Sequence, residues 1–213
     1  MKIKDRAKPK TPPVEAGVYV AICIGVVDLG EPDSEKFKNN YNKVKLIWEL
    51  VGEYIEVDGE QKPRQLSKEF AFSASKKGNL RTFLSSWNSR EYGDEEFGEV
   101  DVFDQIGKPC QLQVVHNETG EYANVANLMP LPRGVAAPAT STKPIRWDME
   151  QWDDVVFTEL PEWIQEQIKK STQYQKEHAP VTDVAVEAPN GGIATTSVST
   201  GFAMTGSGGG APF

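Results

Sequence analysis

Cysteine and histidine are scarce in this chain, which has two of each among its 213 residues. Neither Cys23 nor Cys110 belongs to a Cys-x-x-Cys pair, and both lie in apolar, strand-like runs that favour small buried thiols. His116 and His178 are the only imidazoles, so no cysteine or histidine cluster has the spacing of a zinc site. The sequence therefore predicts neither a metal site nor a cofactor.

Long apolar segments are missing as well. The longest, residues 18–27, is too short to cross a bilayer. The Lys-rich N-terminus is not followed by the apolar segment of a signal peptide. We therefore expect a cytoplasmic protein that has no membrane partner.

The sequence also lacks the common catalytic motifs. The chain contains no Gly-x-Ser-x-Gly elbow, no phosphate-binding Gly-x-x-x-x-Gly-Lys-Ser/Thr loop and no Cys/His/acid set of known spacing. One run of carboxylates could in principle hold a divalent ion, but such runs are usually solvated loops. Its members are Asp94, Glu95, Glu96, Glu99, Asp101 and Asp104. We therefore predict a protein without enzymatic activity.

Charge is unevenly distributed along the chain. The net charge is −8, but residues 1–90 contain 16 Lys/Arg against 12 Asp/Glu, whereas residues 91–213 contain 7 against 19. This acidity argues against a protein coated in phosphate-binding charge, yet it leaves room for a basic surface in the N-terminal half. Composition alone neither indicates nor excludes binding to nucleic acid.

Alternating apolar residues predict a strand-rich domain over residues 14–132. The expected strands are 18–27, 43–51, 66–72, 110–116 and 122–129. Gly25 favours a bulge or bend inside the first strand, and Asp58-Gly59 is typical of a hairpin turn before the third. In the second strand Trp48 lies on the apolar face and should enter the core, whereas Lys43 and Lys45 should point outward.

One helix is expected between the third and fourth strands. Within residues 75–89 the apolar side chains recur at helical spacing, at Leu80, Phe83, Leu84 and Trp87. Three strands, a helix and two more strands make a mainly β protein with the arrangement of an OB-fold, a five-stranded antiparallel barrel. That arrangement is our predicted fold.

The regions outside this domain differ from it in composition. Residues 1–13 combine basic side chains with proline and predict a flexible arm, and residues 133–146 form a Pro-containing linker. Residues 147–176 are acidic and rich in tryptophan, and they predict short helices around Pro161. Residues 177–213 have no sustained period and predict a disordered tail that ends in Pro-Phe.

Cationic and aromatic side chains on neighbouring strands predict a strip for single-stranded nucleic acid. Such sites pair phosphates with Lys or Arg and stack bases on aromatic rings. The candidates are Lys43, Lys45, Lys68, Phe70, Phe72, Lys76, Lys77, Arg81, Tyr19, Tyr41 and Tyr122. For Phe70 and Phe72 the core is the favoured alternative, because an aromatic ring in a strand is more often buried than bound to a ligand.

The chain resembles bacteriophage single-stranded DNA-binding proteins of the replication and recombination modules. The likeness lies in the stretches GVYVAICIGVVDLG, KVKLIWELVGE, LSKEFAFSASKKGNLRTFL and GKPCQLQVVHNETGEYANVANLMPLP, within residues 14–175. It implies an OB-fold that sequesters single-stranded DNA with little sequence preference during phage replication or recombination. It also implies residence in the host-cell cytoplasm.

The resemblance extends to the end of the tail. Bacterial-type single-stranded DNA-binding proteins end in acidic residues followed by Pro-Phe, and this tip recruits replication and repair proteins. Pro212 and Phe213 match that tip, but GSGGGA stands in place of the acidic residues. Recruitment of replication or recombination proteins through this tip is therefore an expectation that rests on two residues.

A second function remains open from the sequence. The acidic segment 147–176 could make the protein an adaptor without catalytic activity, with Trp152 and Trp163 docking on a partner protein. Alternatively, these tryptophans cap the protein's own barrel. Edge-strand pairing and docking of this segment can act within or between chains, so the sequence does not decide between a monomer and a homo-oligomer.

Overall fold

The structure is a computed structural model that describes residues 12–32, 41–57, 59–76 and 78–177. The described residues, all between 12 and 177, belong to one compact unit. Several predictions lie outside the described residues: most of the basic arm, Lys77, and the tail with Pro212 and Phe213. Along the described segments, no helix has the length and hydropathy needed to cross a membrane.

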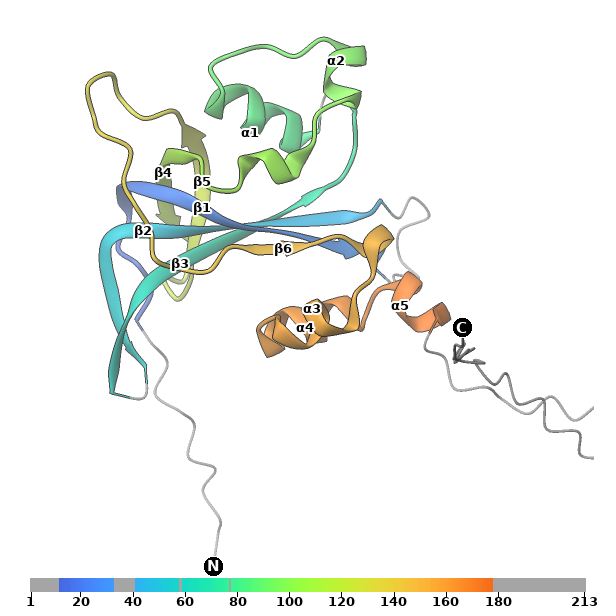
Figure 1. Ribbon diagram of the computed structural model, residues 1–213. Coiled ribbons are helices and arrows are strands. Elements are labelled where there is room, and N and C mark those ends of the chain that lie inside the picture. Colours follow the sequence, from blue (N-terminus) through green and yellow to red (C-terminus); the bar gives the residue numbers. More distant parts are fainter. Residues whose placement is uncertain (1–11, 33–40, 58, 77, 178–213) are drawn as a thin grey trace, which may run out of the picture. The chain divides into compact units, whose positions relative to one another are not determined.

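This unit is built on a six-stranded sheet (Figure 1). Its strands are β1 (Gly17–Gly30), β2 (Lys43–Val57), β3 (Glu60–Ala71), β4 (Pro109–His116), β5 (Ala123–Met129) and β6 (Ile145–Trp147). The order is β3-β2-β1-β4-β5 with antiparallel neighbours, and β6 pairs in parallel with β1. The prediction of a mainly β protein is confirmed, and β3 and β5 are the two ends of an open sheet.

Strand β1 has two different neighbours along one edge. Its residues 17–22 pair with β4, whereas residues 25–27 pair with β6. The register on β2 shifts between Cys23 and Gly25, which confirms the predicted bulge. A Cβ atom at Gly25 would lie 3.1 Å from Cβ of Ile145 and 3.3 Å from Cδ1 of Ile47. Glycine is therefore required here because β6 and β2 approach the bulge closely.

One face of the sheet packs on the helical segment between β3 and β4. That segment comprises α1 (Asn79–Trp87), α2 (Asp94–Gly98) and the 3-10 helix η1 (Val102–Gln105). Leu80, Leu84 and Trp87 of α1 are buried, as their spacing predicts. Trp48 is fully buried on the same side, and its ring centroid lies 6.3 Å from that of Trp87. This confirms the expected helix and the inward direction of Trp48.

The opposite face of β1 and β2 is covered by the C-terminal helices. These are the 3-10 helix η2 (Met149–Gln151), α3 (Asp154–Glu159), α4 (Glu162–Ile168) and α5 (Thr172–Glu177). In Figure 1, α3 and α4 lie across the sheet from α1 and α2. The second core joins strand residues to helix residues: Ile22, Ile24, Val27, Leu29, Ile47, Trp147, Phe157, Leu160, Ile164 and Ile168. Each fully buried aliphatic side chain stabilises the fold by about 1.5 to 3 kcal/mol.

The short helices predicted around Pro161 are therefore present, and they cap the protein's own sheet. Asp153 caps α3 by accepting hydrogen bonds from the backbone N–H groups of Val155 and Val156. Pro161 stands at the start of α4, where its missing N–H costs no helix hydrogen bond. The predicted linker 133–146 differs in one respect, since its last two residues belong to β6.

Candidate nucleic-acid interface

The lysines of strand β2 do not form an open cationic strip. Lys43 is partly exposed, and its Nζ lies 3.7 Å from the Glu69 carboxylate. The expectation that Lys45 points to solvent is wrong, because α4 covers its side chain and leaves it only 5% exposed. The Nζ of Lys45 donates to Gln167 at 2.5 Å, pairs with Glu69 at 3.0 Å and lies 4.8 Å from the Trp163 ring.

Strand β3 and the residue that follows it place their candidates in three different environments. Lys68 is half-buried, donates from Nζ to the carbonyl of Val125 on β5 at 2.7 Å, and lies 4.8 Å from the Phe83 ring. Burial lowers the pKa of Lys68. Phe70 is buried in the core, whereas Phe72, two residues on, is 52% exposed. The core interpretation therefore holds for Phe70 alone.

The cations at the start of α1 are also engaged. The Arg81 guanidinium is buried, donates to Asp94 at 2.8 Å and to the carbonyl of Tyr92, and lies 5.4 Å from the Phe97 ring. Lys76 is exposed and lies 2.9 Å from the same Asp94. Hydrogen bonds from Lys76 and Arg81 lower the pKa of Asp94. These two cations therefore stabilise the α1–α2 connection.

The tyrosine candidates lie far from one another in the chain. Tyr41 is exposed just before β2, and Tyr122 is 59% exposed just before β5. Tyr19 is half-buried and donates from its hydroxyl to the carbonyl of Glu15 at 2.9 Å. The sequence-predicted residues thus spread over both faces and both ends of the sheet.

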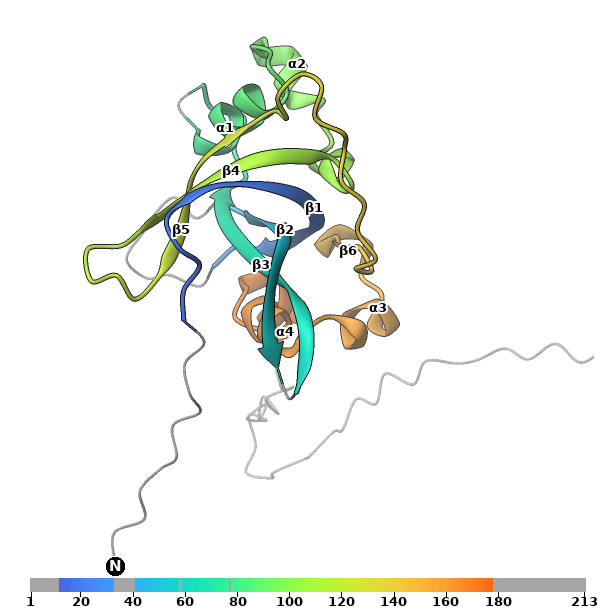
Figure 2. The same ribbon diagram turned by 90° about the vertical axis from the view of Figure 1, so that its left-hand side faces the viewer.

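A groove of about 780 Å³ lies at the open edge between β3 and β5, and we name it the β3–β5 groove. Its lining residues are Pro12, Pro13, Val14, Ile55, Val57, Lys62, Pro63, Arg64, Gln65, Leu66, Glu121, Tyr122 and Ala123. In Figure 2 the chain before β1 passes between the β2–β3 hairpin and the β4–β5 hairpin. The groove is therefore built by three segments that are far apart in the sequence.

The chemistry of the groove combines an aromatic ring, cations and apolar walls. Lys62 is half-exposed and lies 3.6 Å from Glu60, while Arg64 donates to the carbonyl of Pro12. A guanidinium has five N–H donors, so Arg64 keeps donors for a further ligand. Tyr122 stands on the opposite wall, where its backbone N–H donates to Asn117 at 3.0 Å and positions the hairpin.

Sequence reasoning missed Lys62 and Arg64. A signal for them existed, because residues two apart in a strand share a face and both follow the predicted turn at Asp58-Gly59. The register pairs Tyr54 with Pro63 and Ile55 with Lys62, so β3 begins six residues before the predicted strand at residue 66. The groove itself depends on β5 and on Pro12, which no local pattern connects to β3.

The partner-binding candidates of the C-terminal segment have different surroundings. The Trp152 ring packs in an aromatic cluster, with ring centroids 4.8 Å from Trp147 and 4.9 Å from Phe157. Trp163 remains 44% exposed above Lys45. The segment therefore buries much of its aromatic surface within its own unit.

Neither metal chemistry nor thiol chemistry is supported at the described residues. Within those segments no group of three or more His, Cys, Asp or Glu side chains has the geometry to hold a metal ion. Cys23 and Cys110 are fully buried free thiols, as their apolar surroundings predict. Burial raises the pKa of Cys23 to about 12 and also raises that of Cys110, so both remain protonated at neutral pH.

Comparison with known proteins does not assign the chain to a family. No protein-family profile matches it, and no curated protein matches it at a significant level. The functional argument therefore rests on the geometry of the groove and on the residues that line it.

Proposed function

We propose that this protein binds single-stranded DNA in the β3–β5 groove with little sequence preference. Such binding needs cations and an aromatic ring, and the groove contains both. The cations are Lys62 and Arg64, and the ring is that of the exposed Tyr122. Phosphates would pair with the cations while a base stacks on the ring. Base stacking tolerates every sequence because each base has a π-face. The coexistence of these groups in one open groove is the observation that carries the proposal.

The apolar walls fit the same ligand. Ile55, Val57 and Leu66 line the groove and offer surface to base rings. The lining also includes one carboxylate, Glu121, against two cations. The lining thus contains more cations than carboxylates, although Glu60 pairs with Lys62 from outside it and the whole chain has a net charge of −8. Lys62 and Arg64 are the groups in the groove that could pair with a phosphate backbone.

We further propose that the sheet is an OB-fold barrel with a narrow opening at the groove. The order β3-β2-β1-β4-β5 and the helix between β3 and β4 agree with that topology. The hydrogen bond from Lys68 to the Val125 carbonyl spans the opening at 2.7 Å and takes the place of a strand ladder. Lys68 is then a positioning residue that holds β3 beside β5.

The biological setting follows from the sequence resemblance to phage proteins. We propose that the protein protects single-stranded DNA during phage replication or recombination and transfers it to the enzymes of those pathways. This role requires the protein to bind DNA and does not require it to catalyse a reaction. Interaction with replication or recombination proteins through Pro212 and Phe213 belongs to this same proposal.

Salt-dependent binding of fluorescent oligo-dT tests the proposal. We expect affinity to fall steeply as salt rises, because binding releases counterions from the DNA. The double variant Lys62→Gln/Arg64→Gln should bind more weakly, and its log–log salt slope should decrease by about 1.4, at roughly 0.7 per lost phosphate contact. A matched control, Lys143→Gln/Lys176→Gln, removes two exposed cations outside the groove. Equal slopes for the two double variants would exclude the groove, and no binding at low salt would exclude the function.

A further inference from the structure

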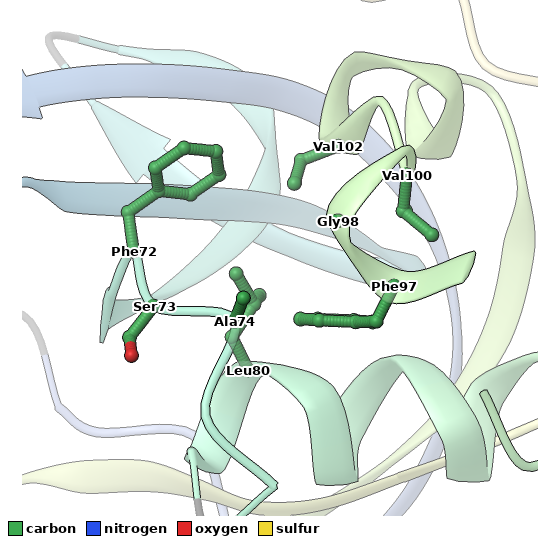
Figure 3. Close-up of a pocket in the computed structure, with 8 residues that line it drawn as sticks. All are labelled: Phe72, Ser73, Ala74, Leu80, Phe97, Gly98, Val100 and Val102. Carbon is green, nitrogen blue, oxygen red and sulfur yellow. The ribbon is translucent and has the colours of Figure 1, made fainter. Parts of the chain in front are cut away.

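A small apolar pocket lies just beyond the end of β3, between Phe72 and the core residues Leu80, Phe97 and Val102 (Figure 3). Its volume is about 110 Å³. Its lining residues are Phe72, Ser73, Ala74, Leu80, Phe97, Gly98, Val100 and Val102. In Figure 3 the Phe97 side chain points toward Ala74 and Leu80, and the Phe72 ring stands on the side of Val102. The pocket therefore has the size and surface to take one apolar side chain.

A second pocket of about 190 Å³ adjoins the first. The two share Phe72, Val100 and Val102, so they lie side by side, and we name the pair the Phe72 cleft. The second pocket differs in that its lining includes four carboxylates. They are Asp28, Asp101, Asp148 and Glu150. The cleft is thus apolar at one end and acidic at the other.

Among the residues that the structure describes, the carboxylates of the cleft have no cationic partner in an ion pair. Asp101 and Asp148 each accept one backbone N–H, from Phe103 at 2.8 Å and from Glu150 at 3.0 Å, which leaves oxygens for a ligand. The lining contains no lysine or arginine, although the guanidinium of Arg146, from outside the lining, stacks on the lining residue Phe103 at 4.2 Å.

The acidic end also shows mutual repulsion. Burial, followed by the charges of Asp148 and Glu150, raises the pKa of Asp28. A cationic group placed among these carboxylates would relieve that repulsion, whereas a phosphate would increase it. Phe72 is thus poorly placed to stack on a DNA base, because the backbone of that DNA would lie against four negative charges.

We propose that the Phe72 cleft docks a short basic peptide of another protein. The peptide would insert one aliphatic or aromatic side chain beside Phe72 and place a lysine or arginine among the carboxylates. Charge complementarity favours this occupant over the acidic part of a second copy, residues 91–213, which contain 7 Lys/Arg against 19 Asp/Glu. The cleft is separate from the β3–β5 groove, with which it shares no lining residue. The protein could therefore hold DNA and a basic partner at the same time.

Fluorescence anisotropy with a defined peptide tests the docking proposal. The probe is a labelled octapeptide that contains one phenylalanine among lysines and serines, with two comparison peptides, one with glutamate for lysine and one with serine for phenylalanine. We expect the parent peptide to bind and both comparison peptides to lose at least about tenfold in affinity, the effect of roughly 1.4 kcal/mol. Phe72→Ala should cause a similar loss.

A pair of charge-matched variants separates the cleft from the net charge of the protein. Asp101→Asn/Asp148→Asn/Glu150→Gln keeps the side-chain acceptors of both capping residues and should weaken peptide binding about tenfold or more. Glu118→Gln/Glu162→Gln/Glu166→Gln removes three exposed carboxylates elsewhere and should retain the parent affinity within about twofold. Equal loss in the two triple variants would overturn the proposal. So would unchanged binding by Phe72→Ala, or no binding of the parent peptide at about 1 mM.

Two further readouts distinguish other outcomes. Oligo-dT affinity should stay the same in Phe72→Ala, so failure of peptide docking and failure of DNA binding are separable. Sedimentation should show no concentration-dependent association that depends on Phe72. Association abolished by Phe72→Ala would identify a second copy as the occupant and overturn the peptide proposal.

Discussion

Replacing Tyr122 with alanine should weaken oligo-dT binding strongly while leaving the fold intact. The Tyr122 ring is 59% exposed, and the described hydrogen bonds of this residue, both with Asn117, involve its backbone N–H and carbonyl, which alanine keeps. Loss of a stacked base costs about 1 to 3 kcal/mol. The dissociation constant should therefore rise about 5- to 150-fold.

Tyr54 is a matched control for this experiment. It is also 59% exposed, but it does not line the β3–β5 groove, since Ile55 and Val57 occupy the groove-facing positions of β2. Tyr54→Ala should leave the dissociation constant within about twofold of the parent value. Anisotropy of labelled oligo-dT at one fixed low salt concentration measures both variants, and thermal unfolding checks their folds. A similar loss of affinity in both variants, or none in Tyr122→Ala, would refute stacking in the groove.

Two predictions concern stability. Ile164→Ala should lower the free energy of unfolding by about 2 to 5 kcal/mol, because Ile164 is fully buried between α4 and the sheet. Urea unfolding measures this change. A loss below about 0.5 kcal/mol would mean that α4 does not pack there. Asp28→Asn should raise the melting temperature at pH 7, because burial raises the pKa of Asp28 and its ionised form opposes folding, while asparagine can still accept the Gly30 N–H. Because the pKa of Asp28 is raised in the folded state, the parent protein regains stability as Asp28 becomes protonated, and the gain in melting temperature from Asp28→Asn should shrink as the pH falls from 7 toward 4. A gain that does not depend on pH would contradict the conclusion that the ionised Asp28 opposes folding.

Local patterns predicted those elements whose side chains alternate or recur regularly. The strand around Trp48 and the helix with Leu80 and Leu84 were predicted because each buries one continuous face. Strand β6 was missed, since three residues are too few to show a period and its pairing to β1 is long-range. Gly25 predicted the bulge, but nothing in the sequence connected it to Ile145, the β6 residue that makes glycine necessary there.

The site was harder to predict than the fold for a physical reason. Alternation tells which side chains share a face of a strand, but not what covers that face. Lys45 lies on the polar side of β2 as predicted, yet α4 folds over it from more than a hundred residues away. Phe70 and Phe72 are two residues apart, but β3 ends at Ala71, and only Phe70 lies under α1, where its ring centroid is 5.0 Å from that of Phe83. Burial and exposure of neighbouring candidates were therefore decided by tertiary contacts.

Photochemical cross-linking tests the central proposal of DNA binding in the β3–β5 groove most directly. An oligo-dT strand containing 5-iodouracil is bound to the full chain at low salt, irradiated and digested, and the cross-linked peptides are identified by mass spectrometry. We predict cross-links at Tyr122, which faces the groove, and none at Phe72, which lies in the acidic cleft. Cross-links at Phe72 without any at Tyr122 would contradict both the groove and the assignment of the cleft to a basic partner.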